Sequence, residues 1–216
     1  MNKVYLEKVF SEERMQKYFS HAPGDELKSM LHYQCNIKVS EALYPVISVL
    51  EVALRNSINR ELAIKFHGPD WYNHFSNTPG LINLLKDISI AKNQITWRHE
   101  LITPSKIVSE LTLGFWVRLF NSEYERVLWK DLRRAFPYLQ KVNRQRHTVS
   151  APLNNFRIIR NRIFHNEPIC WNLNRLQDRH NEMVIVLGWI NRDLPAWLQP
   201  VDRFDLVLFE VRDGLK

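Results

Sequence analysis

The strongest constraint on the fold is a long stripe of apolar side chains in the first third of the chain. Between Ser40 and Phe66 such residues recur at intervals of three and four, the spacing that gathers side chains on one face of an α-helix. The stripe consists of Val46, Val49, Leu50, Ala53, Leu54, Ile58, Leu62 and Ala63. Ser40 can cap this helix, and Pro45 falls near its first turns, where a lost amide is partly tolerated. The pattern predicts a helix, ended by Gly68-Pro69, that buries one face against other elements.

Similar patterns predict helices along most of the remaining chain. The predicted segments are 11–19, 24–39, 78–98, 103–120, 123–135, 143–165 (kinked at Pro152) and 173–192. The tail, 201–211, partly alternates apolar and polar residues, so a short strand or an irregular cover is expected there. Six glycines are few, and the ten prolines mostly lie near helix boundaries, which favours an all-α fold over a turn-rich sheet protein. With no repeat or flexible linker, we predict one bundle-like helical domain over residues 1–216.

The composition indicates a protein of the cytosol. Apolar residues make up 45% of the chain, enough for a substantial core. Cys35 and Cys170 form no motif, and we expect them to be reduced, part-buried packing thiols. The first residues mix acids and bases, unlike a signal peptide, and the apolar stretch 183–190 is far too short to cross a bilayer. We therefore expect a cytoplasmic protein without membrane contacts.

The positive charge is concentrated in one window. The chain carries a net charge of +7, and residues 132–166 contain no acidic residue. The window contains Arg133, Arg134, Lys141, Arg144, Arg146, Arg157, Arg160 and Arg162, with His147 and His165. Such a segment suggests a polyanionic ligand, most simply nucleic acid. Arg144, Arg146 and Arg157 form either a solvated face or, with no acidic neighbours in sequence, a track for an RNA backbone.

Residues with three different chemical roles lie close together at the end of that window. Arg160 can bind a phosphate bidentately, and His165 can move protons near neutral pH. Asn161 and His165 are i,i+4 neighbours on a helix, so the amide can orient the imidazole or bind a phosphate oxygen. Arg162 adds positive charge beside them. The alternative is a polar helix C-terminus whose histidine interacts with the helix dipole.

Polar residues on the apolar helix form a second candidate group. Glu51, Arg55 and Asn56 have the spacing of a simple surface ion pair, but they can also support an active cleft. In that case Arg55 would join the phosphate site and Glu51 would orient it. The aromatic residues of 114–116 and 70–72 are expected in the core, although base stacking by Trp116 is an alternative. The eight histidines are scattered and no metal-binding or cofactor motif occurs, so neither a metal nor a cofactor is expected.

Four segments in order resemble the successive motifs of a known family. They are Glu-Val-Ala-Leu-Arg-Asn at 51–56, Asp-Trp-Tyr at 70–72, Glu-Leu-Thr-Leu-Gly-Phe-Trp-Val-Arg-Leu-Phe at 110–120 and Arg-Asn-Arg-Ile-Phe-His-Asn-Glu-Pro-Ile at 160–169. They resemble motifs of the Abi-like abortive-infection family, which belongs to the HEPN superfamily of helical proteins. The resemblance runs from about residue 40 to residue 170, and its last motif matches the R-x4-H pattern of HEPN ribonucleases.

The resemblance implies a fold, an activity and an assembly. It implies a HEPN-like helical bundle with additional helices, a homodimer with both R-x4-H motifs facing a shared cleft, and metal-independent RNA cleavage in phage defence or toxin–antitoxin systems. The family's catalytic pair falls on Arg160 and His165, with Asn161 as the polar residue after the arginine. Many members carry a second histidine directly after the first, and this chain has Asn166 instead.

We therefore expect an endoribonuclease that uses the RNA 2′-hydroxyl as its nucleophile. One motif histidine per chain cannot supply both the base and the acid of this reaction, whereas a symmetric dimer supplies two. The alternative is a non-catalytic RNA- or protein-binding module of the same fold in a defence system. A neutralising partner would be an antitoxin protein or a small structured RNA.

Overall fold

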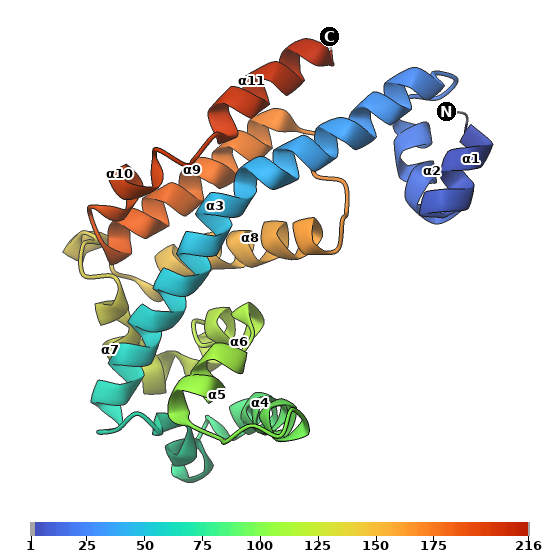
Figure 1. The fold of residues 1–216 in the computed structure, drawn as a ribbon. Helices are drawn as coiled ribbons and strands as arrows, with labels where there is room; N and C mark the ends of the chain where they lie inside the picture. Colours follow the sequence, from blue (N-terminus) through green and yellow to red (C-terminus); the bar gives the residue numbers. More distant parts are fainter. Residues whose placement is uncertain (1–2, 216) are drawn as a thin grey trace.

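One helix of 40 residues, α3 (Glu26–Lys65), runs diagonally through the molecule and organises the other elements (Figure 1). The computed structural model describes residues 3–215, and among them every regular element is helical, which confirms the predicted all-α class. The longer helices around α3 are α1 (Lys3–Phe10), α2 (Glu12–His21), α4 (Leu85–Trp97), α8 (Arg146–Phe164), α9 (Leu173–Ile190) and α11 (Phe204–Gly214). Shorter ones are α5 (Pro104–Glu110), α6 (Leu113–Arg118), α7 (Lys130–Leu132) and α10 (Leu194–Leu198).

The continuity of α3 corrects the predicted break near Ser40. Pro45 lies inside the helix rather than near its start. A proline there removes one backbone hydrogen bond, whose acceptor would be the carbonyl four residues earlier, at Glu41. Because Glu41 lies on the exposed side of α3, water can satisfy that carbonyl. Leu43, Val46 and Ile47 are buried on the other side, and their packing keeps the helix continuous.

Several other predicted boundaries shift. The helix predicted over 78–98 begins only at Leu85, after short 3-10 turns at Trp71–Asn77 and Ile82–Leu84. The segment 103–120 divides into α5 and α6, because Thr112 turns the chain and its hydroxyl accepts a hydrogen bond from the Phe115 amide at 3.3 Å. The predicted helix 123–135 is a succession of short 3-10, π and α turns. The basic helix begins at Arg146 rather than at 143 and continues through Pro152.

The tail is helical, so the expected strand or irregular cover is wrong. Phe204, Leu208 and Val211 of α11 are buried, and their spacing of four and three places them on one face. That face packs against α3 and α9. The partial alternation of apolar and polar residues in 201–211 therefore comes from the apolar face of a helix. The sequence analysis mistook it for the two-residue period of a strand.

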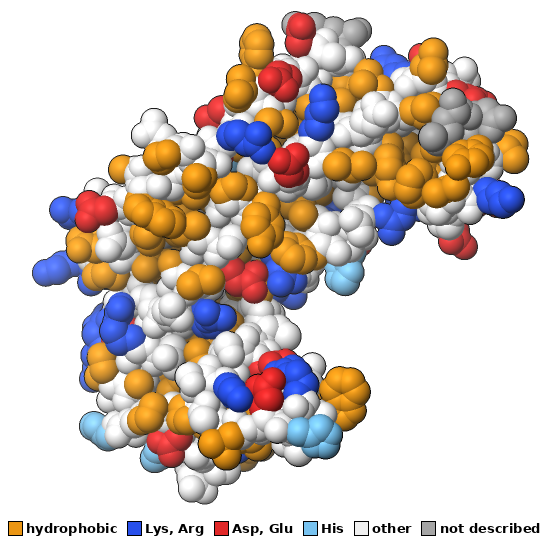
Figure 2. Space-filling view, viewed as in Figure 1, with side chains coloured by type: hydrophobic (Ala, Val, Ile, Leu, Met, Phe, Trp, Pro, Cys, Tyr) orange, Lys and Arg blue, Asp and Glu red, His pale blue; other side chains and the backbone are white. Residues whose placement is uncertain are grey.

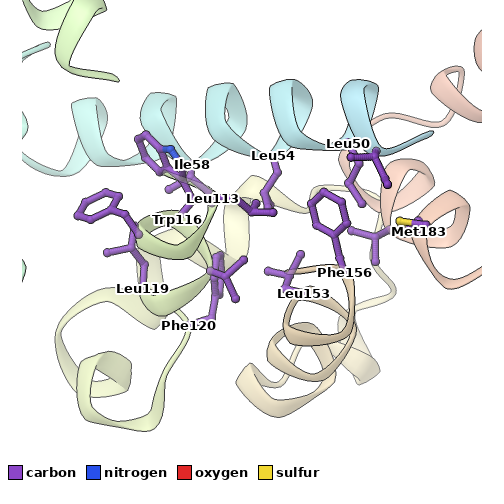
Figure 3. Packing of buried hydrophobic residues seen from close by; sticks show 14 of the residues in the cluster. Leu50, Leu54, Ile58, Leu113, Trp116, Leu119, Phe120, Leu153, Phe156 and Met183 are labelled. Carbon is purple, nitrogen blue, oxygen red and sulfur yellow. The ribbon is translucent and has the colours of Figure 1, made fainter. Parts of the chain in front are cut away.

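The core lies along α3. Figure 3 shows Leu50, Leu54 and Ile58 of α3 pointing toward α6 and α8, where Trp116 and Phe156 meet them. Burying one such aliphatic side chain contributes about 1.5–3 kcal/mol, so this row fixes where α8 lies. The Trp116 indole is buried and donates to the Leu111 carbonyl at 3.2 Å. This confirms the core interpretation of Trp116 and leaves no free ring face for a base.

The elements spread out from α3 in two groups. The α1–α2 hairpin packs near the N-terminal end of α3, whereas α4, α5 and α6 lie toward its C-terminal half (Figure 1). The space-filling view shows a hollow between the α8 side of the molecule and the α4–α6 side (Figure 2). Among residues 3–215 no helix is both long and apolar enough to cross a membrane.

Candidate functional site

Helix α8 presents the R-x4-H motif at its C-terminal end. Leu153, Phe156 and Ile159 are buried and anchor the helix on the core. The opposite side of α8 carries Asn161 and, at the helix end, His165. Asn161 and His165 therefore share the outer side of the helix, as their i,i+4 spacing predicts.

The Arg160 guanidinium is held in place by a carboxylate of α3. Its Nε donates to Glu51 Oε2 at 3.1 Å and its Nη2 to Glu51 Oε1 at 3.5 Å. The guanidinium carbon also lies 4.2 Å from the centroid of the Phe164 ring. Both partners of the ion pair remain partly exposed, at 27% for Arg160 and 29% for Glu51. Within the described chain, Nη1 has no acceptor, so this face of the guanidinium keeps donors for an anion.

His165 lies at the C-cap of α8 with an exposed imidazole. Its backbone amide donates to the Asn161 carbonyl at 2.9 Å, and no residue described in the structure hydrogen-bonds its ring. Residues five apart on a helix point about 140° apart, so Arg160 faces α3 while His165 faces outward. The structure thus brings Asn161 and His165 to one face, and in a single chain it turns Arg160 away from them.

Asn166 ends α8. It adopts a left-handed backbone conformation (φ 54°), which asparagine tolerates better than most residues. Its amide donates to the Ile163 carbonyl at 2.9 Å, and the Glu167 amide donates to the Arg162 carbonyl at 2.7 Å. These two bonds form a Schellman cap. The asparagine that directly follows His165 therefore has a clear structural role.

Two residues that the sequence analysis did not single out hold the segment after the motif. Asn36 of α3 is buried, accepts from the Ile169 amide at 2.7 Å and donates to the Glu167 carbonyl at 3.4 Å. Arg14 of α2 donates to the Asn166 carbonyl at 3.1 Å. Both contacts join segments more than a hundred residues apart, and no local pattern in the sequence marks them.

Arg55 and Asn56 lie away from Arg160. Arg55 Nε donates to Asn56 Oδ1 at 3.5 Å, and both side chains line a cavity of about 380 Å³ beside Asn59 and the start of α5. The expected orientation of Arg55 by Glu51 is not found, because Glu51 pairs with Arg160 from α8. Glu51 therefore pairs with the motif arginine, while Arg55 and Asn56 line the cavity beside α5 and make no hydrogen bond with Arg160 among the described residues.

The basic window has acidic partners in three dimensions, contrary to the sequence-based expectation. Arg146 pairs with Glu125 at 2.9 Å, and its Nη1 donates to the Phe120 carbonyl at 2.9 Å. Arg134 lies 3.2 Å from a Glu61 carboxylate oxygen, and its Nη2 bonds Asp131 at 2.8 Å. These side chains are fixed by internal contacts.

The two remaining arginines of the predicted RNA track, Arg144 and Arg157, differ in whether internal contacts hold their side chains. Arg144 donates to the carbonyls of Leu139 and Pro137, so it supports a loop. The side chain of Arg157, half-buried on α8, makes no hydrogen bond or ion pair with the rest of residues 3–215. Of the three arginines proposed as an RNA track, Arg157 alone keeps its guanidinium uncommitted within the described chain.

Both thiols lie in the interior beside the N-terminal hairpin. Cys35 and Cys170 are free, and both are fully buried rather than part-buried as the sequence analysis expects. Burial raises the pKa of Cys170 to about 12 and also raises the pKa of Cys35. Neither thiol is therefore a nucleophile near neutral pH. Within residues 3–215, no three His, Cys, Asp or Glu side chains lie together as metal ligands would.

Comparisons with known proteins add no assignment. No protein-family model matches the chain, and neither the curated proteins nor the solved structures contain a match.

Proposed function

We propose that this protein is a metal-independent endoribonuclease whose active site is built around Arg160 and His165. The observation that carries the proposal is the arrangement at the end of α8. An exposed imidazole that no residue of 3–215 hydrogen-bonds shares a face with Asn161, while Glu51 holds Arg160 and leaves the Arg160 Nη1 without an acceptor among the same residues. Surface arginines usually sample many rotamers, so a guanidinium that is held in place within one and a half turns of an exposed histidine on the same helix supports a phosphate-handling site.

The chemistry follows from what RNA brings to the reaction. The 2′-hydroxyl attacks the adjacent phosphorus, the bond to the 5′-oxygen breaks, and a 2′,3′-cyclic phosphate and a 5′-hydroxyl result. His165 takes the 2′-hydroxyl proton or gives a proton to the leaving oxygen. Arg160 stabilises the negative charge of the phosphorane, and Asn161 orients the imidazole or a phosphate oxygen.

We further propose that two chains form one site. One chain offers a single motif histidine, whereas cleavage needs a base and an acid. The outward direction of His165 and the divergence from Arg160 fit a site completed by a second copy, in which the arginine of one chain serves the histidine of the other. A homodimer with both motifs in one cleft supplies this arrangement.

The same proposal covers the biological role. The resemblance to the Abi-like family of the HEPN superfamily supports a role in cytoplasmic phage defence or in a toxin–antitoxin system. There its activity would be held in check by an antitoxin protein or a small structured RNA.

One observation favours a second candidate function, a non-catalytic RNA- or protein-binding module. The Glu51 carboxylate neutralises much of the charge of Arg160, and Phe164 covers one face of the guanidinium. A site of this kind binds without cleaving if no second copy supplies the missing group. Cleavage decides between the two functions.

The test is incubation of the purified protein with total RNA in excess EDTA, followed by analysis of the new ends. The proposal predicts fragments with 2′,3′-cyclic phosphate (or its hydrolysis product) and 5′-hydroxyl ends, and no cleavage of DNA, which lacks the nucleophile. Cleavage that requires added Mg²⁺, or fragments with 5′-phosphate ends, would contradict the proposed mechanism. RNA binding without cleavage by the dimer would select the second candidate.

A further inference from the structure

We propose that a cavity between α8 and α9 is a separate binding site for a phosphate group of an RNA strand. The cavity has a volume of about 250 Å³ and is lined on the α8 side by Asn155 and Arg162 and on the α9 side by Arg175 and Arg179. It is distinct from the Glu51–Arg160 pair, because Arg160 and Arg162 point about 160° apart on α8. The proposal rests on the proposed function only in naming RNA as the source of the phosphate.

The charges around the cavity favour an anion. Its lining contains three arginines and no acidic residue. Two carboxylates stand at its edge. Glu167 lies 3.4 Å from Arg162 Nε, and Glu182 lies 2.9 Å from Arg179 Nη1. The two carboxylates offset two of the three positive charges, so the arginines and carboxylates around the cavity keep a net charge of +1.

Two guanidinium groups still have hydrogen-bonding capacity. The exposed Arg175 side chain makes no ion pair or hydrogen bond with the part of the chain that the structure describes. Arg162 Nε is buried without a hydrogen-bond acceptor, because Glu167 lies outside hydrogen-bonding geometry. A buried N–H without a hydrogen-bond acceptor destabilises the protein, and an anion in the cavity would stabilise the positive guanidinium group that carries this N–H.

The remaining lining sets the size and strength of the site. Ile158, Ile159 and Leu176 supply an apolar wall, which lowers the local dielectric constant and strengthens each charge–charge contact. Sites for whole drug-sized ligands usually exceed about 300 Å³, so this cavity suits one phosphate group rather than a complete nucleotide. A strand would continue from the cavity over the surface.

Arg162 links this cavity to the motif. It lies three residues before His165, about 4.5 Å along the helix axis. A phosphate held by Arg162 and Arg175 would therefore anchor the strand close to the histidine, on the side away from α3. In this arrangement the cavity strengthens RNA binding and fixes the position of the strand relative to His165. It takes no part in the cleavage reaction.

The experiment measures binding without cleavage. Affinity for a 2′-O-methyl RNA oligonucleotide, which has no attacking hydroxyl, is measured over a range of salt concentrations for wild type, Arg175→Gln and Arg175→Glu. Arg175→Gln should weaken binding several-fold and lower the slope of log affinity against log salt by about one, and Arg175→Glu should weaken binding further. Arg126→Gln is the matched control, since Arg126 is also exposed and has no ion pair or side-chain hydrogen bond within residues 3–215, but it lies outside the cavity. Circular dichroism and thermal unfolding confirm that the variants fold.

The outcomes separate this proposal from the proposed function. Equal losses in the Arg175 and Arg126 variants, or no oligonucleotide binding by wild type, would overturn the phosphate site. Arg175-dependent binding by a protein that cuts no RNA would remove the ribonuclease and leave the site standing. Oligonucleotides with and without a 5′-phosphate show whether the cavity takes a terminal or an internal phosphate group.

Discussion

Glu51 and Arg160 form the contact that joins the two helices of the candidate site. They are 109 residues apart in sequence, and the carboxylate receives Arg160 Nε at 3.1 Å and Nη2 at 3.5 Å. The pair links α3 to α8 one turn before the motif histidine. We interpret it as a brace for the guanidinium, because a half-exposed pair contributes only about 0–1 kcal/mol to stability.

Glu51→Gln should therefore lower RNA cleavage while leaving the free energy of unfolding nearly unchanged. The glutamine removes the charge that restrains Arg160, so cleavage falls, although less than in Arg160→Ala. In the double variant Glu51→Gln/Arg160→Ala, the Glu51 substitution should lower cleavage little further, because no guanidinium is left to restrain. Glu41→Gln is the control, since Glu41 also lies on α3 and pairs with an arginine, Arg203, at 2.7 Å. Equal activity losses in Glu41→Gln and Glu51→Gln would contradict the brace.

Arg157 and Arg146 should respond differently to the same substitution. Arg146→Gln loses its contacts with Glu125 and the Phe120 carbonyl, so it should destabilise the fold by about 1–3 kcal/mol. Arg157→Gln should change stability by less than about 0.5 kcal/mol, because it breaks no internal contact. RNA affinity should fall in Arg157→Gln. Thermal unfolding and RNA titration measure the two effects, and a stable Arg146→Gln with weakened RNA binding would restore the RNA track as first predicted.

Stability should fall on acidification because of His32. Its ring is buried between His21 and Trp171, and its pKa is lowered by burial and by the nearby His21 and Lys28. Below the ordinary histidine pKa of about 6.5 the unfolded chain binds this proton more readily than the folded chain does. As the pH falls below that value, protonation of His32 in the unfolded chain lowers the free energy of unfolding. Above that pH this loss of stability is absent. Urea unfolding from pH 7.5 to pH 5 measures the effect.

His32→Phe should flatten that dependence, because it removes the titrating group from the aromatic cluster. His99→Gln serves as the control, since His99 is exposed. An unchanged pH dependence in His32→Phe would show that other groups cause the acid sensitivity.

If two chains share one site, an inactive chain should also inactivate the wild-type chain with which it forms a dimer. A heterodimer of wild type and His165→Ala keeps one histidine and lacks either the acid or the base. Its activity should be close to that of the His165→Ala homodimer rather than half that of wild type. The heterodimer can be isolated with two different tags and assayed directly. Half of the wild-type activity would mean that each chain works alone.

The sequence predicts helices more reliably than it predicts their partners. The apolar stripe of α3 and the position of the motif at the end of α8 follow from local periodicity. The continuity through Pro45 does not, because it depends on side chains that only the folded core brings around the helix. The acid-free window shows the same limit, since Glu125 and Glu51 reach Arg146 and Arg160 from other elements.

The contacts that support the candidate site are also beyond local patterns. Asn36 meets the Ile169 amide 133 residues away, and nothing in the sequence around Asn36 distinguishes it from a surface asparagine. Asn166, in contrast, lies where a helix is expected to end, and asparagine favours the left-handed conformation found there.

If His165 acts as the acid or base in RNA cleavage, as we propose, removing its imidazole should abolish most of the activity. Wild type and His165→Ala, both shown to be folded by circular dichroism, are incubated with the same RNA in excess EDTA. Because the imidazole is exposed and makes no hydrogen bond or ion pair with the described part of the chain, its removal should leave stability unchanged. General acid–base catalysis contributes about 10²–10⁴-fold to rate, so cleavage by the variant should fall by at least about a hundredfold. A folded His165→Ala protein that cuts RNA at the wild-type rate would contradict the account.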